Sequence, residues 1–448
     1  MSGALEVASV EAGKFTLSLE QEWKILGVER IREIAEDSRL AEHRNDLLQR
    51  ADGLAHLLSE SEERVLLAKS RALGSDLSLH EELTGSYLFD VTVDGETKTV
   101  TEEEVRTMRS DPDRTKRRES LRSIRHVYNS RQNQIALSRI YTAVVKDHVS
   151  DVELRGYSSV MEPRNISEQL DNTTVDTLLR QVRENAHLMR QYYDLKRQHL
   201  GLETFEVCDA LAPVGSSGRK FSFGESVELH LSTMREFDTE FHDLSVMFLR
   251  EGRVDVSPRP GKRGGAFACY TKNTPSFVLL NHTGEIRDVS TLSHEFGHAI
   301  HGELSQARSH TGFDSPLSLA ETASIFSETL LADRLDQLLE ARERLFLLDV
   351  RIQDMISTIF TQIQYVAFER RVHEAIVRGE ELTYRDLNVM WREERLAFTG
   401  DSIVHDLPAE EESGWSMIPH IFRSPFYCYA YAFGNILVSS LVAKYREH

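Results

Sequence analysis

The chain has 448 residues, 40% of them apolar and 28% charged, a composition typical of a globular protein with two or three domains or one large helical body. Its formal net charge of −19 disfavours nucleic acid and anionic membranes as main partners. The three cysteines, Cys208, Cys269 and Cys428, are far apart, which argues against a disulfide framework or a thiolate metal site. Met1–Thr16 lacks a signal-peptide pattern, and no apolar stretch reaches the roughly 20 residues of a membrane helix. We therefore expect a cytoplasmic protein.

The N-terminal part of the chain has the spacing of helices. Its first 111 residues contain no proline, and apolar residues recur three and four positions apart, which predicts helices joined by short polar turns. One hairpin interrupts them, with strands Tyr87–Val93 and Thr97–Val100 and the turn signal Asp94-Gly95 between them. Helical spacing then runs from Asp113 to His148 and predicts one long helix.

Two short segments, Arg155-Gly-Tyr and Met161-Glu-Pro, then break the helical pattern. We place a boundary there, between an N-terminal helical lobe with the hairpin, residues 1–165, and a second domain, residues 166–448. Helical spacing again dominates the second domain, outside a short region near residue 270. The sequence therefore predicts a mainly α fold.

The second domain contains the pattern His294-Glu295-x-x-His298. Helical residues four apart lie about 40° apart around the axis and one turn apart along it, so both imidazoles can bind one tetrahedral zinc ion. Glu295 lies roughly 100° around from His294, where a general base can take a proton from a zinc-bound water. His301 is two turns away along the axis, so we interpret it as a polar neighbour. A metzincin would have a third histidine at position 304, which is Leu304.

The third ligand should therefore come from another helix. Ser315-Pro316 predicts the start of one, with serine as N-cap and proline at the first helical position. Glu321 then lies in its second turn as the candidate third ligand; a capping box with Ser318 is the alternative. Glu328 lies seven residues further on the same face, either as a hydrogen-bond acceptor for a ligand histidine or as an ordinary exposed carboxylate.

The region near residue 270 has the one β feature expected beside this helix. Two apolar runs, Gly264–Tyr270 and Ser276–Asn281, are joined by Thr271–Pro275. A peptide substrate can pair with a strand edge beside the metal, and glycines allow its backbone to approach closely. The candidate substrate contacts are Gly264, Gly265, Ala266 and Phe267. The alternative is a hairpin that only packs on the metal helix.

Three segments resemble the oligoendopeptidase F family: His294–His301 (HEFGHAIH), Leu319–Ser324 (LAETAS) and Gly261–Phe267 (GKRGGAF). The resemblance runs from about residue 20 to the last residue. Members are cytoplasmic zinc peptidases related to thimet oligopeptidase, so it implies one zinc ion, short peptide substrates and a catalytic domain over residues 166–448. Members extend further at both ends, which implies that flanking helical segments are absent from this sequence and that its groove is more open.

The resemblance also implies a role for the aromatic segment Ile418–Gly434. Amide hydrolysis develops negative charge on the carbonyl oxygen, which a neutral imidazole or tyrosine hydroxyl can stabilise. The resemblance suggests His420 and one tyrosine for this role and leaves the choice between Tyr427 and Tyr429 open. The alternative is that these aromatic residues are core at helical spacing, which we favour for Tyr431.

The helical spacing and the resemblance together imply an elongated multi-helix body, a substrate groove between lobes, and a small β-sheet beside the zinc-binding helix. The leading function is a zinc-dependent endopeptidase that cuts internal bonds of short unstructured peptides. A zinc carboxypeptidase on a similar scaffold is one alternative, and it would need a cation for the substrate carboxylate. A non-catalytic helical zinc protein is another, but a structural site has four protein ligands and only three candidates converge. Cleavage preference and oligomeric state are not predicted.

Overall fold

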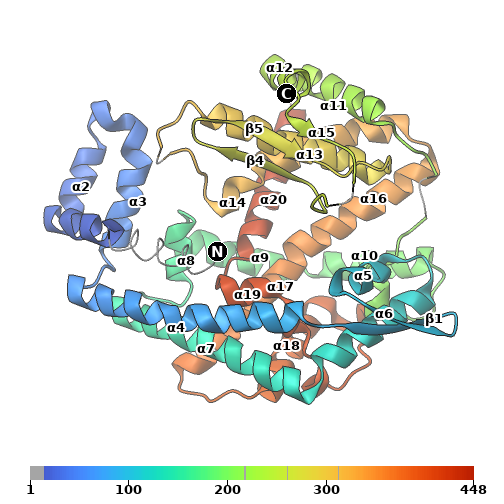
Figure 1. Ribbon diagram of the computed structural model, residues 1–448, viewed down its shortest axis with the longest axis horizontal. Coiled ribbons are helices and arrows are strands. Elements are labelled where there is room, and N and C mark those ends of the chain that lie inside the picture. The colour runs from blue at the N-terminus through green and yellow to red at the C-terminus, as the bar shows by residue number, and fades with distance from the viewer. Residues whose placement is uncertain (1–14, 216–217, 260, 311, 448) are drawn as a thin grey trace. The chain divides into compact units, whose positions relative to one another are not determined.

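The computed structural model describes residues 15–215, 218–259, 261–310 and 312–447. It is built mainly of helices, with one two-stranded and one three-stranded sheet (Figure 1), which confirms the predicted mainly α fold class. The chain forms two compact units, Met1–Ala212 with Phe360–Tyr429 and Pro213–Ile359 with Ala430–His448. Within the described ranges, no helix has both the length and the apolar character needed to cross a membrane.

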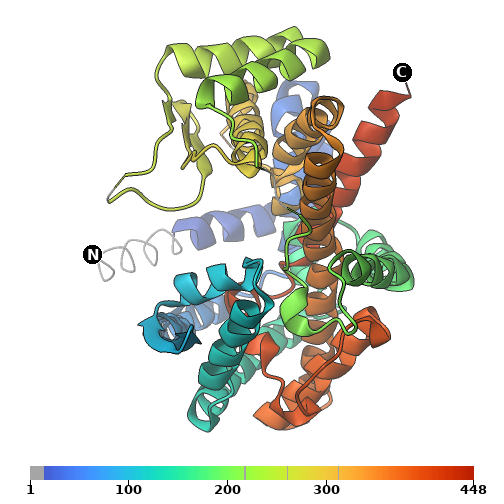
Figure 2. The ribbon, with the colours of Figure 1, turned by 90° about the vertical axis from the view of Figure 1, so that its right-hand side faces the viewer.

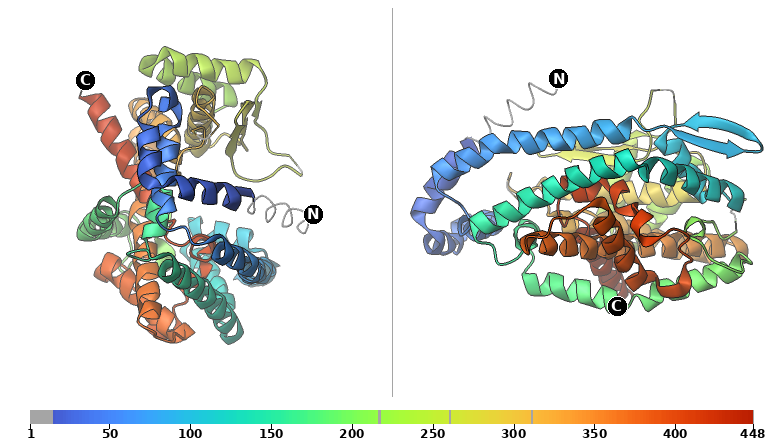
Figure 3. Two further views of the ribbon diagram at one scale, coloured as in Figure 1. Left: turned by 90° about the vertical axis from the view of Figure 1, so that its left-hand side faces the viewer. Right: turned by 90° about the horizontal axis from the view of Figure 1, so that it is seen from below.

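In the part of the first unit that the structure describes, the regular structure consists of helices and one β-hairpin. Residues 15–26 are helical, and the further helices are α2 (Val28–Ala35), α3 (Arg44–Leu54), α4 (Glu60–Gly85), α5 (Glu102–Thr107), α6 (Arg114–Tyr128), α7 (Arg131–Arg155), α8 (Glu162–Ser167), α9 (Asn172–Glu184), α10 (His187–His199), α17 (Gln362–Val377), α18 (Tyr384–Thr399) and α19 (Pro419–Arg423). The long helices α4 and α7 run side by side (Figure 1, Figure 3). The predicted hairpin is confirmed, because β1 (Phe89–Val93) pairs antiparallel with β2 (Glu96–Val100). Asp94 and Gly95 have φ of 55° and 82°, as a two-residue turn of this kind requires.

The long helix predicted over residues 113–148 is two helices, α6 and α7, with a break at Asn129–Ser130. The break leaves carbonyl groups at the end of α6 without helical partners. Side chains from the first turn of α7 satisfy two of them: Asn133 donates to the Val127 carbonyl at 2.8 Å, and Gln134 donates to the Asn129 carbonyl at 2.9 Å. The boundary predicted near residue 165 lies inside the first unit, within the short helix α8.

The second unit contains the HExxH segment and the three-stranded sheet. Its elements are α11 (Phe223–Phe237), α12 (Thr239–Arg250), β3 (Val254–Asp255), β4 (Phe267–Thr271), β5 (Thr274–Leu279), α13 (Ile286–Ser305), α14 (Leu317–Ala320), α15 (Thr322–Leu338), α16 (Ala341–Met355) and nearly all of α20 (Tyr429–Arg446). Helices α11 and α12 lie side by side (Figure 2) and pack with α13. A π-helix, Ile356–Thr361, follows α16 where the chain returns to the first unit.

The sheet has the strand order β3-β5-β4, so β4 is an edge strand. The β4–β5 hairpin was predicted, but its loop is shorter than expected: Thr274 and Pro275 already belong to β5, and Asn273 takes the positive φ of 65° that the tight turn needs. Strand β3, parallel to β5, was not predicted, because two residues carry no detectable periodicity. The edge position of β4 leaves one side of its backbone available for pairing.

Helix α13 lies between this sheet and α15, and two glycines allow the close packing. A Cβ on Gly302 would stand 2.4 Å from the Tyr270 ring of β4, and a Cβ on Gly297 would stand 2.5 Å from the Ala323 carbonyl oxygen of α15. The apolar face of α13 packs in a core formed by Phe248, Val278, Leu280, Leu292, Phe296, Ala299 and Ile300. This packing fixes the rotation of α13 and therefore the direction of its histidines.

Candidate active site

Three candidate metal ligands come together around α13. His294 and His298 lie one turn apart on the helix, with ring centroids 5.0 Å apart and ring planes nearly perpendicular. Glu321 Oε2 lies 3.3 Å from His294 Nε2 and 3.2 Å from His298 Nε2. Glu321 occupies the break between α14 and α15, so its predicted place in the second turn of one continuous helix is wrong, and the helix starts one residue later than Ser315-Pro316 predicted. Pro316 has ψ of 151° and lies outside the helix, which begins at Leu317.

The spacing of these ligand atoms fits a zinc ion. Nitrogen and carboxylate ligands bind tetrahedral zinc at about 2.0–2.2 Å, so any two of them stand roughly 3.3–3.6 Å apart. The observed separations from Glu321, 3.3 Å to His294 Nε2 and 3.2 Å to His298 Nε2, lie at the lower end of this range and 0.1 Å below it. Among the described residues, His294, His298 and Glu321 also form one of two clusters of potential ligands. The donor set of two imidazoles and one carboxylate leaves a fourth position open, as catalytic zinc sites do.

The charges around His294 favour a cation in the same place. Burial by itself would lower the pKa of His294, but hydrogen bonds to Glu321 and Glu328 outweigh burial and raise it to about 10. Glu328 Oε2 lies 3.2 Å from His294 Nδ1, the ring nitrogen that faces away from Glu321. For Glu321, burial would raise the pKa, but hydrogen bonds with His294 and His298 lower it well below its usual range. The cluster therefore stabilises positive charge, either a proton or a metal ion.

Glu295 is buried beside this cluster. Burial raises the pKa of its carboxyl, while the neighbouring His294 and His298 and a backbone hydrogen bond from Ala268 in β4 act in the opposite direction. A carboxylate with a raised pKa is a stronger base than a solvated one, which suits proton transfer. His301 is not part of the ligand cluster, and burial lowers its pKa.

A cavity of about 530 Å³ opens beside the cluster. It is lined by His294, Glu295, His298 and Glu321, by Ala266 and by the β4 residues Phe267–Tyr270. Of the predicted substrate contacts, Ala266 and Phe267 line this cavity. Gly264 and Gly265 come directly before them in the sequence and are not among the lining residues. Gly265 has φ of 76°, which a side chain would strain, and a Cβ on either glycine would meet no atom within 4 Å.

Comparison with known proteins decides the family. The model of peptidase family M3 matches residues 107–447, which is most of the chain. The chain belongs to peptidase family M3. It is similar to the chromosomal oligoendopeptidase F of Lactococcus lactis subsp. cremoris, with 29% identity over 322 residues that cover 70% of this chain and 52% of the relative. It is also similar to oligopeptidase PepF of Bacillus subtilis, with 26% identity over 395 residues that cover 87% and 58%.

Solved structures show the same M3 fold. A crystal structure of a Chlamydophila abortus protein is 26% identical with a TM-score of 0.81 and covers 92% of this chain and 69% of that chain. The structure of oligoendopeptidase F from Enterococcus faecium is 21% identical with a TM-score of 0.71 and covers 95% and 69%. The chain spans between about half and two thirds of the length of the curated relatives it matches.

The other predicted residues of this M3 chain, His420, Tyr427 and Tyr429, belong to the first unit. The rings of His420 and Tyr427 stack with centroids 5.6 Å apart, and both side chains are half-buried. Burial, followed by nearby Arg423, lowers the pKa of His420, which keeps its imidazole neutral near pH 7. Tyr429 is completely buried, and among the described residues its hydroxyl has no hydrogen-bond partner. Exposure therefore favours Tyr427 over Tyr429 for contact with a substrate.

Two supporting contacts were missed by sequence reasoning. Ser324 Oγ donates to Glu321 Oε2 at 2.8 Å, and Ala268 N–H donates to Glu295. The first had a signal, because a serine three residues after a glutamate on a helix can reach it. The second had none, because it joins a strand and a helix that lie 27 residues apart in the sequence.

The second cluster of potential metal ligands has a different character. Glu206, Cys208 and Asp209 meet near the start of a 3₁₀ turn, but arginines occupy both carboxylates. Asp209 pairs with Arg114 at 2.6 Å, and Arg118 pairs with Glu206 at 2.6 Å. These positive charges oppose a metal ion at that position.

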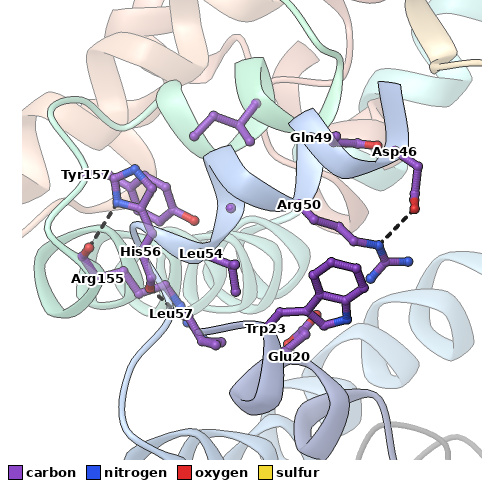
Figure 4. A pocket seen from close by; sticks show the side chains of 12 residues that line it. Glu20, Trp23, Asp46, Gln49, Arg50, Leu54, His56, Leu57, Arg155 and Tyr157 are labelled. Carbon is purple, nitrogen blue, oxygen red and sulfur yellow. Dashed lines mark hydrogen bonds and ion pairs between the residues drawn. The ribbon is translucent and has the colours of Figure 1, made fainter. Parts of the chain in front are cut away.

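A cavity of about 420 Å³ lies within the first unit (Figure 4). Its lining includes Trp23, the ion pair of Arg50 with Asp46 at 3.0 Å, and the stacked rings of His56 and Tyr157, 3.9 Å between centroids. None of the predicted catalytic, metal-binding or substrate-contacting residues lines this cavity, and among the described residues neither cluster of potential metal ligands lies in it.

Proposed function

We propose that the protein is a zinc-dependent endopeptidase that hydrolyses internal bonds of short, unstructured peptides. The observation that carries the proposal is the cluster of His294, His298 and Glu321, with its ligand atoms at zinc spacing and the buried carboxyl of Glu295 beside it. Membership of peptidase family M3 and the names of the oligopeptidase relatives support it.

His294, His298 and Glu321 would hold one zinc ion, with Glu328 orienting the His294 ring through Nδ1. The zinc ion, when bound, supplies Lewis acidity toward the scissile carbonyl and lowers the pKa of water. Glu295 takes the proton of the attacking water and delivers it to the leaving amine. Its burial keeps the carboxyl in a site of low dielectric, where its proton affinity is high.

The edge strand β4 gives a physical reason for peptide substrates. An extended peptide can pair with the edge of β4 that has no strand partner, beside the cavity that also contains Glu295. It would use the backbone groups of this edge other than the Ala268 N–H, which donates to Glu295. Such pairing consists of hydrogen bonds to the peptide backbone and requires an extended, unfolded segment, so it favours flexible peptides over folded proteins. We also propose that His420 and Tyr427 supply neutral donors for the oxyanion, and that Gly264 and Gly265 allow the peptide backbone to approach the start of β4.

A digest analysed by mass spectrometry tests the proposal. The zinc-loaded protein is incubated with an unstructured peptide ladder and with a folded protein that has exposed, protease-sensitive loops. Internal cleavage of the peptides with sparing of the folded protein is expected, and Glu295→Gln is the matched control. Rapid cutting of the folded protein, or release of single C-terminal residues alone, would contradict an oligoendopeptidase.

The free state of Cys208, Cys269 and Cys428 supports a reducing compartment, and we propose the cytoplasm.

A further inference from the structure

A second cavity, of about 330 Å³, opens next to Glu295 within the second unit. Its walls come from α13, α15, α16 and the residue before β4, and it shares Ala266, His294 and Glu295 with the cavity beside the metal ligands. The two cavities are therefore adjacent. A volume of 330 Å³ is near the lower limit for small-molecule pockets, which suits one side chain or chain end of a peptide.

Part of the lining of this cavity is apolar and packs against the core of the second unit. Ile286 and Leu347 belong to a buried core cluster that joins α13, α15 and α16, and Phe346 packs against that cluster. Val350 adds a further apolar surface from α16. A ligand group with a short aliphatic stem could therefore be buried against these side chains at a favourable free energy.

The charged lining residues are paired, with one exception. Arg287 pairs with Asp354, His294 pairs with Glu328, and Glu295 accepts the Ala268 N–H. The exception is Arg351 of α16, which lines the cavity and is half-buried. Across the described ranges Arg351 has neither a hydrogen bond nor an ion pair. A half-buried guanidinium without a partner loses hydration and gains nothing in return, so an anion in this cavity would stabilise it.

We propose that this cavity is a substrate subsite in which Arg351 binds a carboxylate of the peptide. The inference rests on the proposed peptidase function and adds the class of group that the site prefers. Side chains of a peptide paired with β4 alternate between two sides, so one of them can enter a cavity that shares Ala266 with the strand segment. The carboxylate belongs either to an aspartate or glutamate side chain or to the free C-terminus of a short peptide.

Kinetics with matched peptides tests the subsite. Pairs that differ only by glutamate or glutamine are compared by kcat/KM at each position flanking the scissile bond. We expect the natural protein to favour glutamate at one position by about tenfold, the effect of one charge-assisted hydrogen bond, and Arg351→Gln to lower this ratio to about one. Arg351→Glu should reverse the charge preference, so that a peptide with lysine at this position is cleaved with a higher kcat/KM than the peptide with glutamate. Arg342→Gln is the matched control, because Arg342 is an exposed residue of α16 that does not line the cavity.

A second comparison identifies the source of the carboxylate. The same peptides are prepared with a free or an amidated C-terminus and cut close to that end. If Arg351 binds the chain end, amidation should lower kcat/KM by about tenfold in the natural protein. In Arg351→Gln, amidation should then leave kcat/KM unchanged. If Arg351 binds an acidic side chain, amidation should have no effect while the glutamate preference persists.

Direct binding separates this inference from the proposed function. Fluorescence anisotropy with labelled peptides is measured on Glu295→Gln, with and without the added Arg351→Gln, so that no turnover is needed. A weaker affinity for the carboxylate-bearing peptide in the double variant supports the subsite even if no peptide is hydrolysed. The inference is overturned if Arg351→Gln changes neither the kcat/KM ratios nor these affinities, whatever the activity of the natural protein.

Discussion

Gly297→Ala should destabilise the protein and weaken its metal site, although alanine favours a helix over glycine by about 1 kcal/mol. A Cβ at this position would lie 2.5 Å from the Ala323 carbonyl oxygen and 2.7 Å from Ser324 Cα, while ordinary contacts begin at 3.4 Å. Helices α13 and α15 would therefore have to separate by about 0.9 Å. Overpacking of this kind costs typically about 1–3 kcal/mol, so the clash should outweigh the gain in helix propensity.

The separation also reaches the metal ligands. Glu321 is two residues before Ala323, while His294 and His298 lie on the helix that would move away from it. Metal–ligand distances tolerate only about 0.2 Å, so zinc affinity should fall by at least about tenfold. Thermal unfolding of the metal-free protein measures the first effect, and competition with a chromophoric chelator measures the second.

Gly74→Ala is the matched control. Gly74 is an exposed position inside α4, and a Cβ there would meet no atom within 4 Å. The same substitution should therefore keep the melting temperature or raise it slightly, and leave zinc affinity unchanged. If Gly297→Ala behaved like Gly74→Ala in both measurements, the close packing of α13 on α15 would not be what holds the ligands in place.

Three further substitutions test the site and the first unit. Glu321→Ala should lower the zinc content at limiting zinc and abolish peptide cleavage, whereas full metal content and full turnover would exclude Glu321 as a ligand. Glu295→Gln should retain zinc and lower kcat by about 10²–10⁴-fold, and near-normal kcat would exclude Glu295 as the general base. Burial raises the pKa of Glu369 from 4.5 to about 8, so the folded state keeps a proton that the unfolded chain releases. Stability should therefore fall by about 1.4 kcal/mol for each pH unit between those values, and Glu369→Gln, measured by urea unfolding across pH 5–8, should remove this slope. An equal slope in both proteins would contradict that assignment.

The sequence alone determined the features that depend on near neighbours in the chain. The spacing of His294 and His298 on a helix follows from helical geometry, and the two hairpins follow from apolar strands with turn residues between them. Both signals are local, because a helical hydrogen bond joins residues four positions apart and a tight turn joins strands that follow each other in the sequence. The mainly α class is a sum of such local signals.

Only the tertiary structure decided which distant residues meet. The break that places Glu321 against both histidines, the short strand β3, the edge position of β4 and the unpaired charge of Arg351 in its cavity all depend on contacts between elements. The division into units also differs from the boundary expected at residue 165, because Phe360–Tyr429 returns to pack with the first 212 residues. Contacts of this kind depend on burial and shape complementarity between helices and strands that are distant in the sequence. They leave no periodic pattern in the sequence from which they could be predicted.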